Sequence, residues 1–213
     1  MYTELVMTII CVIGTVAFSV SGAMVAIKKH ADIFGAVTLA VVTATGGGMV
    51  RDILLGIQPP HAFLDSRYIF IAAAAALIVF LIAYIGKDAY ISRENFIDSV
   101  NNIFDALGLG VFVVMGTQTA IDYGFSQNAL LSVFIGTLTG IGGGFLRDIM
   151  VHEIPSMLKK HIYALAALSG SLIFYIMYTN SLGYTLSAFF GATATFLLRM
   201  LATRFKWNLP PAY

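Results

Sequence analysis

The sequence predicts an all-α integral membrane protein: seven transmembrane helices, made of two inverted three-helix repeats and a seventh helix. Of its 213 residues, 59% are hydrophobic and 11% are charged, whereas a soluble domain carries about 25% charged residues. Seven apolar runs are long enough to cross a bilayer as helices. A glycine-rich motif with a charged pair occurs once in the second run and once in the fifth.

A helical span requires about 20 mostly apolar residues. By this criterion we expect spans at residues 5–27, 34–56, 67–86, 100–120, 128–151, 162–179 and 183–203. The first span is expected to be retained rather than cleaved as a signal, because Glu4 precedes its apolar run while Lys28 and Lys29 follow it. We therefore expect a single membrane domain over residues 1–213, in which residues 87–99 form the strongly polar loop.

Prolines and turn residues separate the later spans. Pro59 and Pro155 follow the second and fifth spans, where a helix would end. Asp65 is placed to cap the third span. Gly183 lies in the short turn between the last two spans. The seventh span ends in a basic and aromatic tail that contains Trp207, which is typical of the membrane interface.

The chain contains an internal repeat. The motif Gly-Gly-Gly-x-x-Arg-Asp occupies residues 46–52 and recurs 96 residues later at 142–148. The pattern Gly-x3-Phe-x3-Gly-x3-Ala at residues 14–26 recurs 94 residues later at 108–120. Two repeats are therefore expected, at about residues 5–86 and 100–179, and the helix at about 183–203 belongs to neither.

Three spans in each repeat place the second copy in the membrane upside down. Inverted repeats of this kind put substrate or ion paths at the repeat interface, near the midplane. Cytoplasmic loops carry an excess of lysine and arginine, and here one side of the membrane receives nearly all of them. These residues are Lys28, Lys29, Lys87, Arg93, Lys159, Lys160, Arg199, Arg204 and Lys206. The N-terminus is therefore expected outside and the C-terminus in the cytoplasm.

The glycine triplets Gly46–Gly48 and Gly142–Gly144 fall near the middle of their spans. Glycine costs about 1 kcal/mol relative to alanine in a helix interior, so three in a row, twice, indicate a use. One interpretation is a bent helix whose freed carbonyl oxygens hold a transient monovalent cation. The alternative is close helix packing by small residues.

Arg51 and Arg147 follow their triplets inside apolar spans, where an ionisable side chain is costly. Because adjacent helical residues do not face each other, we expect neither Asp52 nor Asp148 to neutralise the neighbouring arginine. Asp105, early in the fourth span, is a candidate partner. The arginines either line a polar path or form buried structural ion pairs that lock helices together.

Hydroxyl residues at the same depth are weaker candidates for a wet path, since serine and threonine often bond back to their own helix. The residues expected along the ion path are Gly46, Gly47, Gly48, Arg51, Asp52, Gly142, Gly143, Gly144, Arg147, Asp148, Asp105, Thr45, Thr139 and Ser19. We expect no enzyme, no resident metal site and no cofactor, because no hydrolase, phosphate-binding or metal-ligand motif occurs. A net charge of +1 gives no reason to expect a nucleic-acid partner.

Two three-helix units, each with Gly-Gly-Gly-x-x-Arg-Asp in its second helix, and a seventh helix resemble the prokaryotic branch of the trimeric intracellular cation channels. Bacterial relatives also carry the label glycine transporter. The resemblance implies a homotrimer in membrane lipid, with a passive pore for potassium and sodium in each protomer and kinked second and fifth helices beside it. It also implies a prokaryotic plasma (inner) membrane. No Lys-Glu-Val motif of the animal members occurs, so their gating is not implied.

Two other functions remain open at this point. Inverted repeats and broken helices suit a secondary transporter for a small zwitterion such as glycine equally well. A trimer that conducts nothing and uses the motifs only for packing is the third possibility. The absence of a third polar cluster, which would bind carboxylate and ammonium separately, favours the channel.

Overall fold

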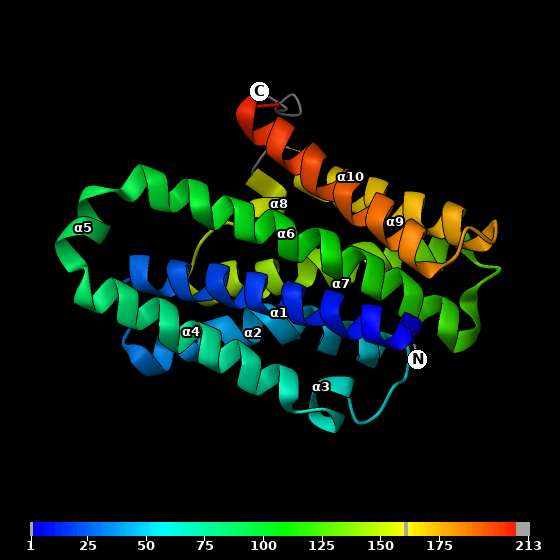
Figure 1. Ribbon diagram of the computed structural model, residues 1–213, viewed down its shortest axis with the longest axis horizontal. Coiled ribbons are helices and arrows are strands. Elements are labelled where there is room, and N and C mark those ends of the chain that lie inside the picture. The colour runs from blue at the N-terminus through cyan, green and yellow to red at the C-terminus, as the bar shows by residue number, and fades with distance from the viewer. Residues whose placement is uncertain (1, 160–161, 208–213) are drawn as a thin grey trace.

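The computed structural model describes residues 2–159 and 162–207, and within them the regular structure is helical (Figure 1). The α-helices are α1 (Tyr2–Lys28), α2 (Ile33–Leu54), α3 (His61–Leu64), α4 (Arg67–Ile85), α5 (Lys87–Ser92), α6 (Glu94–Ala120), α7 (Ala129–Met150), α8 (Ser156–Lys159), α9 (Tyr163–Thr179) and α10 (Tyr184–Arg204). A π-helical turn, η1 (Ile121–Phe125), follows α6. Lys160 and His161 lie outside the described residues.

The long helices agree with the predicted spans. Six of those described are long and apolar enough to cross a membrane: α1, α2, α4, α6, α7 and α10. The span expected at 162–179 corresponds to α9, which is apolar but has only 17 residues. The prediction of an all-helical integral membrane protein is therefore confirmed, with six clear spans and one shorter apolar helix.

The segment 87–99 is not a loop, contrary to the prediction. It forms α5 and the first turns of α6, which begins at Glu94. The two acidic residues of this part of α6 have a shared partner, since the Lys28 ammonium lies 2.8 Å from an Asp98 carboxylate oxygen and 3.1 Å from one of Glu94. Because α1 supplies this charge, the helix extends beyond the apolar stretch from which its start was predicted.

Matched side chains cap α2 and α7, the two helices that carry the glycine motif. The Asp32 carboxylate accepts a hydrogen bond from the Gly35 amide (2.7 Å), and the Asn128 side chain accepts one from the Leu131 amide (3.0 Å). An oxygen at this position satisfies an amide that has no partner within the helix. Asp32 and Asn128 are 96 residues apart, the same spacing as the two motifs.

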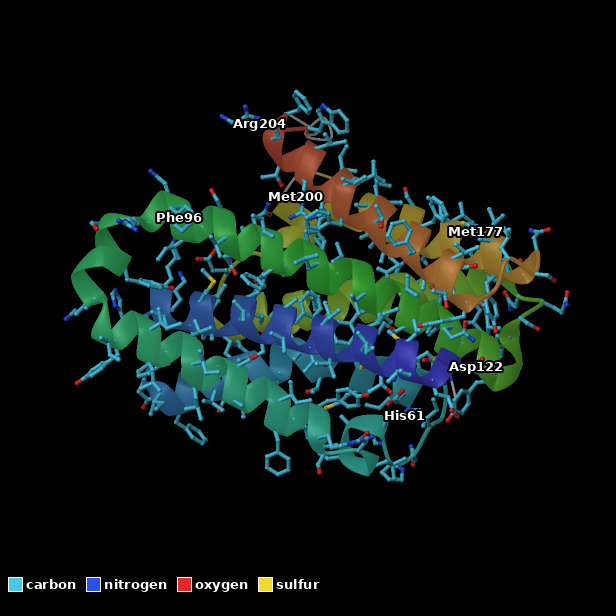
Figure 2. All side chains as sticks on the ribbon, viewed as in Figure 1. His61, Phe96, Asp122, Met177, Met200 and Arg204 are labelled. Atoms are coloured by element: carbon cyan, nitrogen blue, oxygen red, sulfur yellow. The ribbon has the colours of Figure 1, made fainter. Side chains whose placement is uncertain are left out.

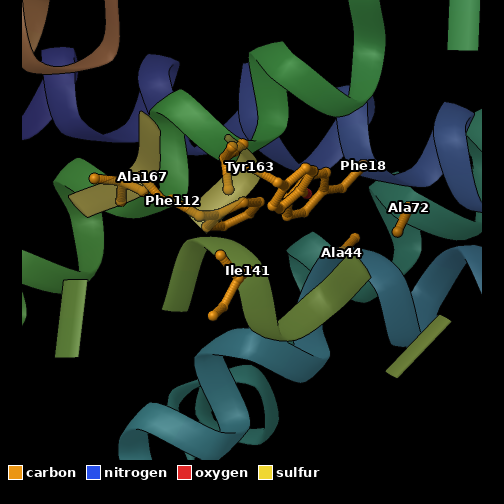
Figure 3. Packing of buried hydrophobic residues seen from close by; sticks show 9 residues of the cluster. Phe18, Ala44, Ala72, Phe112, Ile141, Tyr163 and Ala167 are labelled. Atoms are coloured by element: carbon orange, nitrogen blue, oxygen red, sulfur yellow. The ribbon is translucent and has the colours of Figure 1, made fainter. Parts of the chain in front are cut away.

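The helices form two groups of three that meet in the middle of the molecule. α1, α2 and α4 pack against one another, and α6, α7 and α9 do the same. The groups meet where α1 contacts α6 and α2 contacts α7, while α10 lies on α6 and α9 (Figure 1). The main buried apolar cluster draws residues from both groups and lies at this junction (Figure 3).

Candidate functional site

The second glycine of each motif lies where the backbones of α2 and α7 touch. A Cβ added to Gly47 would collide with the carbonyl oxygen of Thr139, and one added to Gly143 would collide with that of Thr43. A Cβ added to Gly142 would lie 3.0 Å from the Cα of Gly47. Only glycine permits so close an approach, so the triplets act as the contact surface between the two helices.

The third glycine of each motif leaves room for the arginine that follows it. A Cβ on Gly48 would lie 3.7 Å from the nearest guanidinium nitrogen of Arg51, and one on Gly144 would lie 3.6 Å from that of Arg147. Helical side chains lean toward the N-terminus of their helix, so a residue three positions later folds back over the bare backbone. This geometry accounts for the spacing Gly-x-x-Arg in both copies.

Both helices continue through their glycine triplets. α2 is α-helical from Ile33 to Leu54 and α7 from Ala129 to Met150, and no glycine of either triplet has a positive φ. The helical course agrees with the alternative interpretation, close packing by small residues, while a transient cation at these carbonyls stays a prediction. The contact between α2 and α7 compensates for the low helix propensity of glycine by burying the bare backbone.

Each arginine is bonded to the aspartate beside it. Arg51 donates from Nε (2.8 Å) and Nη2 (2.7 Å) to Asp52 Oδ1, and Arg147 donates from Nε (2.9 Å) to Asp148 Oδ1. The prediction that adjacent residues would not pair is wrong. The prediction rested on the directions of the Cβ atoms, whereas the arginine side chain is long and flexible enough to reach the carboxylate of the next residue.

The second oxygen of each aspartate holds the segment that follows. Asp52 Oδ2 accepts a hydrogen bond from the His61 amide (2.8 Å), and Asp148 Oδ2 accepts one from the Ser156 amide (2.7 Å). His61 and Ser156 begin the short helices α3 and α8. Each aspartate therefore holds both an arginine side chain and the start of the following short helix at the C-terminal end of its own helix.

Asp105 is a partner of Arg147, as predicted. Arg147 Nη1 donates to Asp105 Oδ1 (2.8 Å) and to Ser21 Oγ (2.7 Å), so this guanidinium joins α7 to α6 and α1. The residue 94 positions before Asp105 is Cys11, which lies in the same cavity as Arg51. Among the described residues, one carboxylate therefore pairs with Arg51 and two pair with Arg147.

Two cavities reach the two arginines from opposite ends of the bundle. The first vestibule, about 400 Å³, is lined by residues that include Cys11, Thr15, Thr45, Gly48, Arg51, Asp52, His61, Asp65, Phe112, Met115 and Asp122. The second vestibule, about 260 Å³, is lined by residues that include Lys28, Lys29, Asp98, Asn102, Asp105, Arg147, Asp148, Glu153 and Arg199. Figure 2 shows His61 and Asp122 toward one end of the molecule and Phe96, near the start of α6, toward the other.

Three carboxylates line the first vestibule, and two of them are paired with arginines, Asp52 with Arg51 and Asp65 with Arg67. Asp52, Asp65 and Asp122 line it together with Arg51. A hydrogen bond from Arg67 lowers the pKa of Asp65, so this carboxylate stays ionised at neutral pH. Acidic side chains at an entrance raise the local concentration of cations.

The predicted hydroxyl residues serve the packing of the helices more than the cavities. Ser19 Oγ donates to the Ala72 carbonyl of α4 (2.5 Å). Thr45 and Thr139 donate to carbonyls one turn earlier in their own helices, at 2.8 and 2.7 Å. Of these three side chains, Thr45 is the one that lines a vestibule described above.

The comparisons with known proteins agree with this geometry. A family model described as "Glycine transporter" matches residues 8–84 and 102–179. A UPF0126 membrane protein of Vibrio cholerae is 36% identical over 202 residues, which are 92% of this chain and 79% of the relative. The inner membrane protein YadS of Escherichia coli is 32% identical over 93% of this chain and 92% of its own length. The chain belongs to the family that this "Glycine transporter" model describes.

The chain is also similar to solved structures that are described as TRIC channels. A prokaryotic TRIC channel crystallised in 0.5 M KCl is 36% identical, with a TM-score of 0.87 over 98% of this chain and all of the other. A TRIC orthologue from Rhodobacter sphaeroides is 31% identical, with a TM-score of 0.84 over 95% of this chain and 99% of its own. The resemblance to the trimeric intracellular cation channels is thereby confirmed.

Arg199 lies beside the second vestibule but was not predicted as a site residue. Arg199 was counted among the charges that flank the membrane, but it is 2% exposed, and its guanidinium carbon lies 4.4 Å from the centre of the Tyr163 ring. It also donates to Asn102 (3.1 Å), so α10 is joined to α6 and α9 beside the second vestibule. An arginine within an apolar span was the available signal, and its place near the span end concealed it.

Proposed function

We propose that this chain is a passive channel for monovalent cations, potassium and sodium, and that it assembles as a homotrimer with a path through each protomer. The observation that carries the proposal is the pair of polar vestibules, each ending at a buried arginine and entering the bundle from opposite ends. The similarity over nearly the whole chain to structures described as TRIC cation channels supports the same function.

The path proceeds from the first vestibule to the second between α1, α2, α6 and α7. Acidic side chains at the first vestibule draw cations in, while pairing with carboxylates neutralises the arginines at both inner ends. Of the site residues predicted from the sequence, those of the glycine crossing and of the two Arg-Asp pairs border this path. Opening requires movement of α2 against α7 at that crossing, because the backbones there are in contact.

The chain forms one membrane domain of two inverted three-helix repeats, with α9 as a span despite its length and α10 as the seventh. The matching caps, crossings and Arg-Asp pairs support the repeat, as do the two segments that the family model matches. The excess of lysine and arginine on one side supports an N-terminus outside and a cytoplasmic C-terminus. With this orientation, the first vestibule opens outward and the second inward, in a prokaryotic inner membrane.

Reconstitution in liposomes tests the proposal. We expect purified protein to release entrapped potassium down its gradient, with a reversal potential that follows the potassium equilibrium potential and no requirement for a coupled solute. Replacing potassium with a large organic cation is the control, and it should abolish the current. Vesicles containing folded protein that pass neither potassium nor sodium under any applied gradient would contradict the channel.

A transporter for glycine is the second candidate, favoured by the description of the matching family model. Saturable uptake of radiolabelled glycine, driven by an ion gradient and unaccompanied by unitary currents, is its signature. We expect no such uptake, because the buried arginines at the inner ends of the two vestibules are already paired with carboxylates of the protein and so are not open to a zwitterion's carboxylate.

A further inference from the structure

Two phenylalanines stack on each other between the vestibules. Phe18 of α1 and Phe112 of α6 have ring centroids 5.2 Å apart with an interplanar angle of 24°. The two residues are 94 positions apart and hold the same place in the pattern Gly-x3-Phe-x3-Gly. We propose that this pair is the apolar gate of the path, an inference that rests on the proposed channel function.

Each ring is seated by the other helix in a reciprocal way. The Phe18 ring covers Gly108 so closely that an added Cβ would collide with it, and the Phe112 ring lies 3.3 Å from a Cβ built on Gly14. The glycine four residues before each phenylalanine therefore receives the ring of its counterpart. This arrangement accounts for the Gly-x3-Phe part of the pattern and centres the stack on the contact between α1 and α6.

The stack occupies the short interval that separates the two polar regions. On α1, Thr15 lines the first vestibule and Ser21 bonds to Arg147 of the second, with Phe18 midway between them. Six residues of helix span about 9 Å. Phe112 itself forms part of the wall of the first vestibule. The barrier between the vestibules is thus only about two helical turns thick, and the aromatic pair lies within it.

The surroundings of the stack are mostly apolar. Both rings belong to the central apolar cluster, with Leu109, Val113 and Ile141 as neighbours, and Phe18 is 1% exposed (Figure 3). A narrow apolar constriction excludes water, and a cation that would have to shed its hydration shell there does not pass. Rotating the rings apart, together with the movement of α2 against α7 proposed above, would join the two vestibules.

Phe174 provides a matched control within the same chain. It is fully buried, and its ring stacks on Tyr178 with centroids 5.5 Å apart. It belongs to a different apolar cluster, and it does not line either vestibule. Replacing Phe174 by alanine removes as much buried ring as replacing Phe18, but away from the proposed path.

The test compares potassium flux into liposomes for the unaltered protein, Phe18→Ala, Phe112→Ala and Phe174→Ala, normalised to folded protein by size-exclusion chromatography. We expect both gate variants to raise flux on the order of tenfold by letting water into the constriction, while Phe174→Ala leaves it unchanged. Phe18→Leu and Phe112→Leu keep the site apolar and nearly filled, and serve if the alanine variants do not fold. They should raise flux by less than the alanine variants.

The outcomes separate this inference from the channel itself. Unaltered protein that conducts, with gate variants that conduct at the same rate or more slowly, overturns the gate and leaves the channel standing. An equal rise in Phe174→Ala also overturns the gate, because general loosening would then explain the leak. If neither the unaltered protein nor any folded variant passes a cation, the channel proposal fails and the gate fails with it.

Discussion

Gly143→Ala is expected to lower the stability of the protein more than the small size of the change suggests. The new methyl group would collide with the carbonyl oxygen of Thr43, which is backbone and cannot rotate away. Overpacking typically costs about 1–3 kcal/mol and occasionally more, while alanine regains about 1 kcal/mol of helix propensity. Because the collision is with backbone, we place the overpacking cost at or above the upper end of that range, which leaves a net loss of roughly 2 kcal/mol or more and a Tm about 4–8 °C lower. Thermal unfolding of the purified protein in detergent measures it.

Gly47→Ala should behave in the same way, because its methyl group would meet the carbonyl oxygen of Thr139. Gly48→Ala is the matched control from the same triplet. The nearest atom of a neighbouring side chain would be a guanidinium nitrogen of Arg51 at 3.7 Å, which is an ordinary contact. This variant should be as stable as the parent or up to about 1 kcal/mol more so. Equal losses at all three positions would mean that helix flexibility, and not the crossing, is what the glycines provide.

The sequence predicted the architecture well because hydropathy and repetition report directly on membrane burial. Every expected span corresponds to a helix, and Asp105 was identified as a partner for a buried arginine because an intramembrane charge needs one. The start of α6 was missed since polar residues there are stabilised by Lys28 from α1, a contact between helices that hydropathy along the chain does not report.

Side-chain torsions and tertiary packing account for the rest. The pairing of Arg51 with Asp52 depends on how a flexible side chain folds over Gly48, which the spacing of Cβ atoms does not decide. One interpretation of the glycine triplets was a bent helix, because glycine is a poor helix former in isolation, and the alternative was close packing by small residues. The backbone of the facing helix favours the alternative by packing on the bare surface.

Arg147→Met is expected to be the most damaging change at the ion pairs. It would leave two carboxylates, Asp105 and Asp148, inside the bundle without their cation, and both are at most 6% exposed. Removing one member of a buried pair costs about 3–5 kcal/mol, because the remaining charge has lost both water and its partner. We expect a loss at the upper end of that range, measured as the shift in Tm or in the midpoint of denaturant unfolding.

Arg51→Met is the matched variant and should cost clearly less. It leaves a single carboxylate, Asp52, whose other oxygen still accepts the His61 amide and lies 3.2 Å from the half-exposed imidazole. The double variant Arg147→Met with Asp105→Leu should recover part of the loss, since it removes one of the two orphaned charges, and coupled sites deviate from additivity by about 0.5–3 kcal/mol. Equal losses for the two arginines, without recovery in the double variant, would contradict the asymmetry. The presence of Asp105 where the first repeat has Cys11 would then carry no energetic weight.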